Sequence, residues 1–174
     1  MKLTSQQHQA GIGLIEVLVA LLILAVAILG FSALQMNALR TTDESILRSR
    51  AMTVMRSGAE VMRLHHDVID DFKSQLNSLQ GQSKATPDTD CMDNDCTFAE
   101  LAQYDATMLH NYAFDNEVQI NIDTCAGTSG NQTRQCMIVS WGDTQPDFNG
   151  NTNSCANANG LYQARATCFI MEAY

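Results

Sequence analysis

The sequence predicts an α+β fold in which one long N-terminal helix precedes a polar domain of shorter helices and strands. Three observations support this prediction. An apolar run at 14–34 continues without a break into a segment of helical periodicity, three later segments alternate apolar and polar residues, and all cysteines lie after residue 90. A chain of 174 residues can bury the core of one domain beside such a helix, but hardly of two.

The apolar run is long enough to cross a membrane as a helix. Its 21 residues carry one formal charge, Glu16, and at ~1.5 Å per residue they span roughly the 30 Å of a bilayer core. A cleavable secretory signal is the alternative, but its apolar core has about 7 to 15 residues and ends at a small-x-small cleavage site. The run here is longer, and no such site follows it. We therefore expect a membrane-spanning helix.

Glu16 is unexpected in this segment. A carboxylate inside a spanning helix costs a few kcal/mol at the bilayer centre and less near the interface, so it usually has a partner. Taken alone, the residue allows two interpretations: it lies at the headgroup level without a special role, or it pairs with a positive charge supplied by another molecule.

The helix is expected to continue beyond the apolar run, because no Gly or Pro lies between Phe31 and Ser57. In its second half, apolar residues recur every three or four positions with arginines between them. This amphipathic pattern predicts one stripe that packs on the following domain; the stripe consists of Leu39, Ile46, Leu47, Ala51, Val54, Met55, Ala59 and Met62.

Two shorter helices are predicted next. Apolar spacing over 68–79 favours a short amphipathic helix, followed by an exposed loop at 81–90. Thr97 and Glu100 then have capping-box spacing and open a helix that continues to about residue 114. His65 and His66 are adjacent, so on a helix they point about 100° apart, form a poor metal pair and are expected at the surface.

Strands are predicted at 117–123 and 135–142, and the segment 161–173 is long enough for a final strand or a bent pair. A turn-rich segment flanked by Cys125 and Cys136 joins the first two strands, and we expect a disulfide across this hairpin.

The cysteine pattern favours disulfides formed in an oxidising compartment. A zinc site is disfavoured, because the spacings lack paired CxxC motifs and no histidine lies near the later cysteines. Six cysteines permit fifteen pairings. The sequential set adds two bonds to the hairpin disulfide, so that the candidates are Cys91 with Cys96, Cys125 with Cys136, and Cys155 with Cys168.

Charge and composition exclude several functions. The net charge of -9, with 10 Lys+Arg against 19 Asp+Glu, argues against nucleic-acid binding. The histidines are scattered and no Gly-rich phosphate loop follows a strand, so we predict no catalytic residue, metal or cofactor. In the loop 143–153, alternating Asp and Asn side chains suggest calcium ligands, but the bidentate Glu of an EF-hand is missing and turn chemistry is favoured. The sequence leaves calcium binding by this loop open.

The stretch AGIGLIEVLVALLILAVAILGF at 10–31 resembles the class III signal of type IV prepilins and pseudopilins. The resemblance implies that prepilin peptidase cuts after Gly11, that Ile12 becomes the N-methylated new N-terminus, and that Glu16 stands at the fifth mature position. In that family this carboxylate neutralises the N-terminal amine of a neighbouring subunit during assembly. The leader of eleven residues and Ile12 in place of Phe or Met differ from major pilins and favour a minor pilin.

The segment 34–63 resembles most closely the PilV-like minor pilins, or type IV pilus modification proteins. This implies a leader at 1–11, a transmembrane half-helix at 12–34, an amphipathic half-helix at 35–64 and a periplasmic α+β head at 65–174. An antiparallel sheet of about four strands, stapled by disulfides, would pack on the helix. The protein would be anchored in the inner membrane with a cytoplasmic N-terminus, and would become extracellular in the assembled pilus.

The implied function is to prime pilus assembly. Partners would be the peptidase, other minor and major pilins, the inner-membrane assembly platform and a large pilus-tip adhesin, in support of twitching motility and attachment. A minor pseudopilin of a type II secretion system is the nearest alternative, since it shares the N-terminus. A pilin that captures DNA is the second, but after Arg63 the only basic residues are Lys73, Lys84, Arg134 and Arg165.

Overall fold

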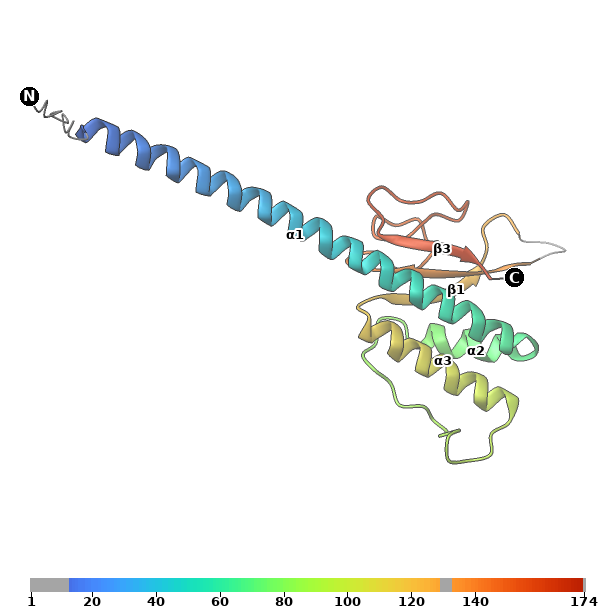
Figure 1. Cartoon of the computed structure of the whole chain (residues 1–174). Helices are drawn as coiled ribbons and strands as arrows, with labels where there is room; N and C mark the ends of the chain where they lie inside the picture. The colour runs from blue at the N-terminus through green and yellow to red at the C-terminus, as the bar shows by residue number, and fades with distance from the viewer. Residues whose placement is uncertain (1–12, 129–132, 174) are drawn as a thin grey trace, which may run out of the picture. The chain divides into compact units, whose positions relative to one another are not determined.

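The computed structural model describes residues 13–128 and 133–173 of the chain. The elements, in order, are α1 (Leu14–Leu64), the 3-10 turn η1 (His66–Val68), α2 (Ile69–Ser78), α3 (Phe98–Asp115), β1 (Gln119–Thr124), β2 (Gln135–Ser140) and β3 (Cys168–Glu172) (Figure 1). The chain divides into two compact units, Met1–Glu44 and Ser45–Tyr174. A long helix, an antiparallel sheet and three disulfides confirm the predicted α+β fold.

The helix α1 is continuous over 51 residues, as its lack of internal proline allows. Five residues of the predicted stripe are buried, and Gly58 joins them: Ala51, Val54, Met55, Ala59 and Met62. The stripe is shorter than predicted, because Leu39 and Ile46 are exposed. Ala51, Val54, Met55 and Met62 contribute to one core with the inward-facing side chains of α2, α3 and the sheet.

Gly58 is a point of close contact between α1 and its neighbours. A Cβ built on this residue would lie 2.6 Å from both Sδ and Cε of Met137 on β2, and 3.2 Å from a methyl group of Leu109 on α3. The absence of a side chain at Gly58 therefore makes room for the Met137 side chain against the helix.

The sheet has the order β1-β2-β3, with both neighbouring pairs antiparallel. Ile120 lies opposite Val139, which in turn lies opposite Phe169. One face of the sheet joins the core shared with α1, and residues of the other face, including Ile138 and Cys168, pack under the loop that precedes β3.

Three strands, rather than about four, form the sheet among the described residues. The predicted strand region 161–173 yields only β3, with one isolated bridge between Tyr162 and Ala156. Arg165 has φ 67°, a left-handed conformation that ends an extended segment. The backbone of this loop also bonds locally, since the N–H of Gln163 donates to the carbonyl of Cys155.

The helix α2 closes one edge of the sheet. The side-chain amide of Asn77 donates to the backbone carbonyl of Ile122 at 2.7 Å, and its oxygen accepts the N–H of Ile122 at 3.1 Å. Both backbone groups of this β1 residue are thus satisfied by one side chain, in the manner of a neighbouring strand.

The three disulfides join Cys91 to Cys96, Cys125 to Cys136 and Cys155 to Cys168, which is the sequential pairing. The sequence separations are 5, 11 and 13 residues, so each bond closes a short loop. The second bond crosses the β1–β2 hairpin, and the third ties the loop before β3 to the start of that strand.

The loop at 143–153 uses its polar side chains for turns. A carboxylate oxygen of Asp147 accepts the N–H of Asn149, and the hydroxyl of Ser154 accepts the N–H of Asn151. Over residues 13–128 and 133–173, no group of three or more His, Cys, Asp and Glu side chains is placed to hold a metal ion.

The predicted capping box opens α3. The Thr97 hydroxyl accepts the N–H of Glu100, and a carboxylate oxygen of Glu100 accepts the N–H of Thr97 at 2.8 Å. Hydrogen bonds from the backbone N–H and then from the hydroxyl of Thr97 lower the pKa of Glu100 below its ordinary value.

Replacing Thr97 by alanine is expected to lower the free energy of unfolding by about 1 kcal/mol, because the cap is lost. A lowered folded pKa adds stability above the ordinary pKa of Glu, and this stability is lost as the pH falls through the folded value. Urea unfolding of the full chain in detergent at neutral and at acidic pH measures both effects. In Glu100→Gln the acid-side loss should shrink, and an unchanged pH profile in this variant would contradict the role of the carboxylate.

Candidate functional site

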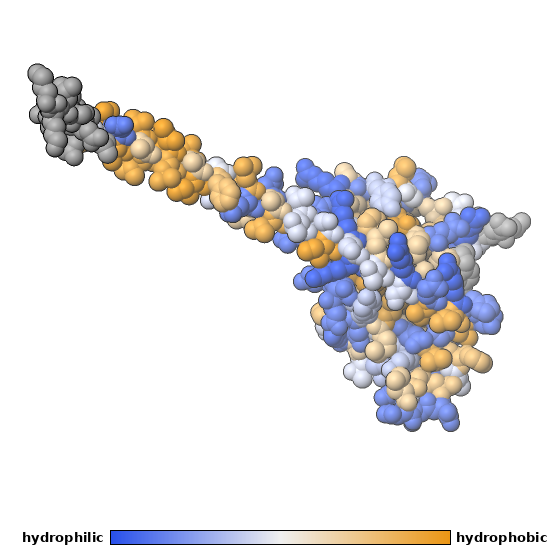
Figure 2. All heavy atoms as spheres, in the orientation of Figure 1, coloured by the Kyte–Doolittle hydropathy of each residue, from blue (hydrophilic) through white to orange (hydrophobic). Residues whose placement is uncertain are grey.

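The first unit presents an apolar helical surface. The large apolar side chains between Leu14 and Leu39 are all exposed, from 47% for Val17 to 80% for Leu14. Hydrophobic residues cover this part of α1 in Figure 2. Among the described residues, α1 is the one helix long and apolar enough to cross a membrane, judged by length and composition. Monomeric soluble proteins rarely expose apolar patches of this extent, so the surface requires lipid or other helices around it.

Glu16 is the only charged residue from Leu14 to Leu39 and lies in the first turn of α1. The backbone N–H groups of Glu16 and Val17 both donate to the carbonyl of Gly13, which fixes the start of the helix. The positive end of the helix dipole favours a carboxylate at this position. Within the part of the chain that the structure describes, no side chain or terminus forms an ion pair with Glu16.

The other two predicted processing residues, Gly11 and Ile12, lie outside the described residues. The structure thus places Glu16 at one end of an apolar helix but does not describe the amine that cleavage would create. A carboxylate in apolar surroundings needs a counter charge, because burying it alone costs several kcal/mol. The geometry is suited to a carboxylate that receives a cation from another molecule.

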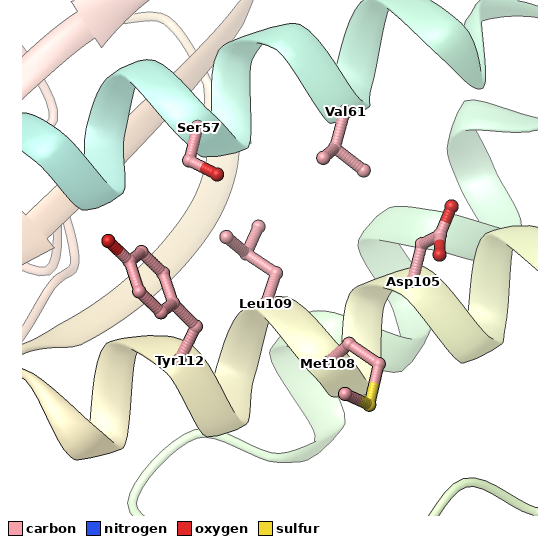
Figure 3. A pocket seen from close by; sticks show the side chains of 6 residues that line it. All are labelled: Ser57, Val61, Asp105, Met108, Leu109 and Tyr112. Carbon is pink, nitrogen blue, oxygen red and sulfur yellow. The ribbon is translucent and has the colours of Figure 1, made fainter.

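A second site, which the sequence did not indicate, lies between α1 and α3 in the second unit. The groove has a volume of about 220 Å³ and is lined by Ser57, Val61, Asp105, Met108, Leu109 and Tyr112 (Figure 3). Four of its six lining residues come from consecutive turns of α3, and the other two come from α1. The 3-4 spacing of this face was visible in the sequence, but the position of α1 beside it was not.

His65 lies next to this groove, and its expected surface position is wrong. Its side chain is buried, its Nε2 lies 2.8 Å from Oδ2 of Asp105, and its ring stacks on Phe72. The physical reason is that α1 ends at Leu64, so the turn that follows directs His65 into the core while His66 stays exposed. A buried imidazole needs a polar partner, and Asp105 supplies it.

Two family models match the chain. The model of the prokaryotic N-terminal methylation motif matches residues 6–32, and the model described as type IV pilin Tt1218 matches residues 33–107. The two matches are contiguous and include all of α1 and α2 and the first half of α3. No curated protein and no solved structure matches the chain.

Proposed function

The chain is a type IV prepilin-like protein that carries an N-terminal methylation motif, and from this premise we propose that it acts as a minor pilin of a type IV pilus. A pilin or pseudopilin role is structural rather than enzymatic, in agreement with the prediction that the chain is not an enzyme. The observation that carries the proposal is the exposed apolar surface of α1 from Leu14 to Leu39, a segment in which Glu16 is the only charged residue.

The proposed mechanism starts with cleavage after Gly11 by prepilin peptidase. Cleavage creates an ammonium group at Ile12, which becomes N-methylated and stays positively charged. Glu16 then binds the ammonium group of a neighbouring subunit as the helix enters the filament. The Coulomb attraction is strengthened because the surrounding helices are apolar and exclude water. The same helix serves first as a membrane anchor and afterwards as part of the filament core.

The proposed domains are the leader at 1–11, the membrane half-helix at 12–34, the amphipathic half-helix at 35–64 and the head at 65–174. The motif and the apolar helix fit an inner-membrane-anchored pilin. Three disulfides support a head outside the cytoplasm, where thiols are oxidised. With other pilins and the assembly platform, the protein would prime assembly and support adhesin display, twitching motility and attachment.

The N-terminus of the protein purified from cells tests this proposal directly. We expect mass spectrometry of the N-terminal peptide to find a chain that begins at N-methylated Ile12. A strain without prepilin peptidase provides the control and should retain Met1. An intact Met1 in cells with active peptidase would rule out the proposed processing.

A minor pseudopilin of a type II secretion system remains the alternative, because the methylation motif supports both roles. Deletion of the gene separates them. Loss of surface pili with normal protein secretion is expected for a minor pilin, whereas loss of secretion with normal pili would assign the chain to the secretion system.

A further inference from the structure

One face of α3 exposes a regular row of large apolar side chains. Phe98, Leu101, Met108 and Tyr112 are 82%, 37%, 45% and 41% exposed, and Asp105 occupies the middle of the row. The steps between these five residues alternate between three and four, which is the spacing of the seam that a helix presents to a partner helix. We call this row the α3 seam. Other residues of α3, among them Ala102, Ala106 and Ala113, contribute to the core. The side chains of the seam therefore stay exposed in the folded head.

The centre of the seam opens into the groove between α1 and α3. In Figure 3 the Tyr112 ring lies at one end of the lining residues and the Asp105 carboxylate at the other, with apolar side chains between them. The groove volume of about 220 Å³ suits one long side chain. Val61 and Leu109 offer contacts to an aliphatic stem, as the side chains of Lys and Arg possess.

Asp105 gives the groove its chemical preference. Its Oδ2 bonds to His65, while within the described residues its Oδ1 forms no hydrogen bond or ion pair. The side chain is 33% exposed. One carboxylate oxygen therefore remains available at the edge of an apolar groove, where a hydrogen-bonded cation is its most favourable partner.

The net negative charge of the head favours a basic partner. After Leu64 the sequence contains 15 Asp+Glu and 4 Lys+Arg, which gives a net charge of -11. Asp93, Asp95 and Glu100 lie close in sequence to the start of the seam. A second head carries the same net negative charge and is repelled, whereas a basic partner is attracted.

We propose that the α3 seam binds an amphipathic helix of another protein, and that this helix places an Arg or Lys side chain against Asp105 in the groove. The apolar side of the partner helix packs on Phe98, Leu101 and Met108, and the stem of its basic side chain lies over Val61 and Leu109. This mode is the insertion of a helix into a groove, with apolar anchors at 3-4 spacing and one charge that fixes the register. It does not depend on processing at Gly11.

Photo-crosslinking in cells tests this proposal with the full-length protein. A photoreactive benzoylphenylalanine replaces Met108, and in a matched control it replaces Tyr162, which is 55% exposed in the loop before β3. We expect at least tenfold more protein adduct from position 108, mapped by mass spectrometry to a helical segment with Lys or Arg within one turn of the linked residue.

Two further variants test whether the charge of Asp105 and the apolar side chains of the α3 seam are required for the adduct. Asp105→Lys should reduce the adduct at least fivefold, but it also removes the partner of His65. Leu101→Lys leaves the His65–Asp105 pair intact and should reduce the adduct by a similar factor. The proposal would be overturned by equal adduct yields at positions 108 and 162, or by an adduct yield that Leu101→Lys does not change. It would also be overturned if the adduct contained lipid, a second copy of this chain, or a segment without basic residues.

Discussion

Replacing Glu16 by alanine is expected to lower the amount of this protein in purified pili at least tenfold, with cleavage after Gly11 left intact. The expected size follows from the cost of an unpaired buried charge: removing one partner of a buried ion pair costs about 3–5 kcal/mol, and each 1.4 kcal/mol is about a factor of ten. In the variant, the ammonium group of the neighbouring subunit would have no carboxylate to bind in the apolar core. Immunoblots of sheared pili and of membranes measure the two pools separately.

Two controls separate the charge from other effects at this position. Glu16→Gln keeps the size of the side chain and should fail like alanine, because it lacks the charge. Asp43→Ala removes an exposed carboxylate from the same helix, beyond the apolar surface, and should enter pili normally. If the Glu16→Ala protein is incorporated at the wild-type level, the charge pairing has no role in assembly.

The second large effect is expected at Gly58. Replacing it by leucine should lower the free energy of unfolding of the head by about 2 kcal/mol, although leucine favours a helix more than glycine does. The added side chain would occupy the space that the end of Met137 now fills, where even a Cβ would lie 2.6 Å from its sulfur. Urea unfolding of the full chain in detergent, followed by the near-ultraviolet circular dichroism of the buried Trp141, measures the change.

Gly30 provides a matched control on the same helix. A Cβ at this position would meet nothing within 4 Å, so Gly30→Leu should leave the unfolding of the head unchanged. The double variant Gly58→Leu with Met137→Ala should be more stable than the sum of the two single effects predicts, because the shortened side chain makes room. If Gly58→Leu unfolds at the same urea concentration as the wild type, the helix and the sheet can separate at this point without loss of stability.

The elements with strong local signals could be predicted from the sequence. The stripe from Ala51 to Met62 and the capping box of Thr97 and Glu100 depend on spacing within one helix, and both are present in the structure. The candidate site was predictable only in part. Glu16 is distinguished by its apolar surroundings in the sequence, whereas the groove at Asp105 requires two helices whose relative position no local pattern specifies.

The wrong predictions have a common physical origin. A surface position for His65 would follow from a helix that continued through both histidines. The helix instead ends at Leu64, and a long-range contact with Asp105 stabilises the buried imidazole. The strand count failed for a similar reason. Residues 161–167 have the composition of a strand, but a left-handed residue and local hydrogen bonds to the preceding loop hold them out of the sheet.

The positions of the disulfides have a mechanical consequence. All three lie after residue 90 and close short loops, so no disulfide joins α1 to the rest of the head, and the covalent connection is the backbone that continues from Leu64. A pulling force applied along α1 would reach the sheet through side-chain packing, notably where Gly58 meets Met137 and Leu109, through the ion pair of Arg50 with Glu117, and through the backbone that leaves α1 at Leu64. Under tension the hairpin and loop closed by disulfides would keep their shape. The packing contacts of α1 with the sheet and with α3 would break first. The resistance of this subunit to pulling therefore depends on how α1 packs against the sheet and α3, and not on the disulfides.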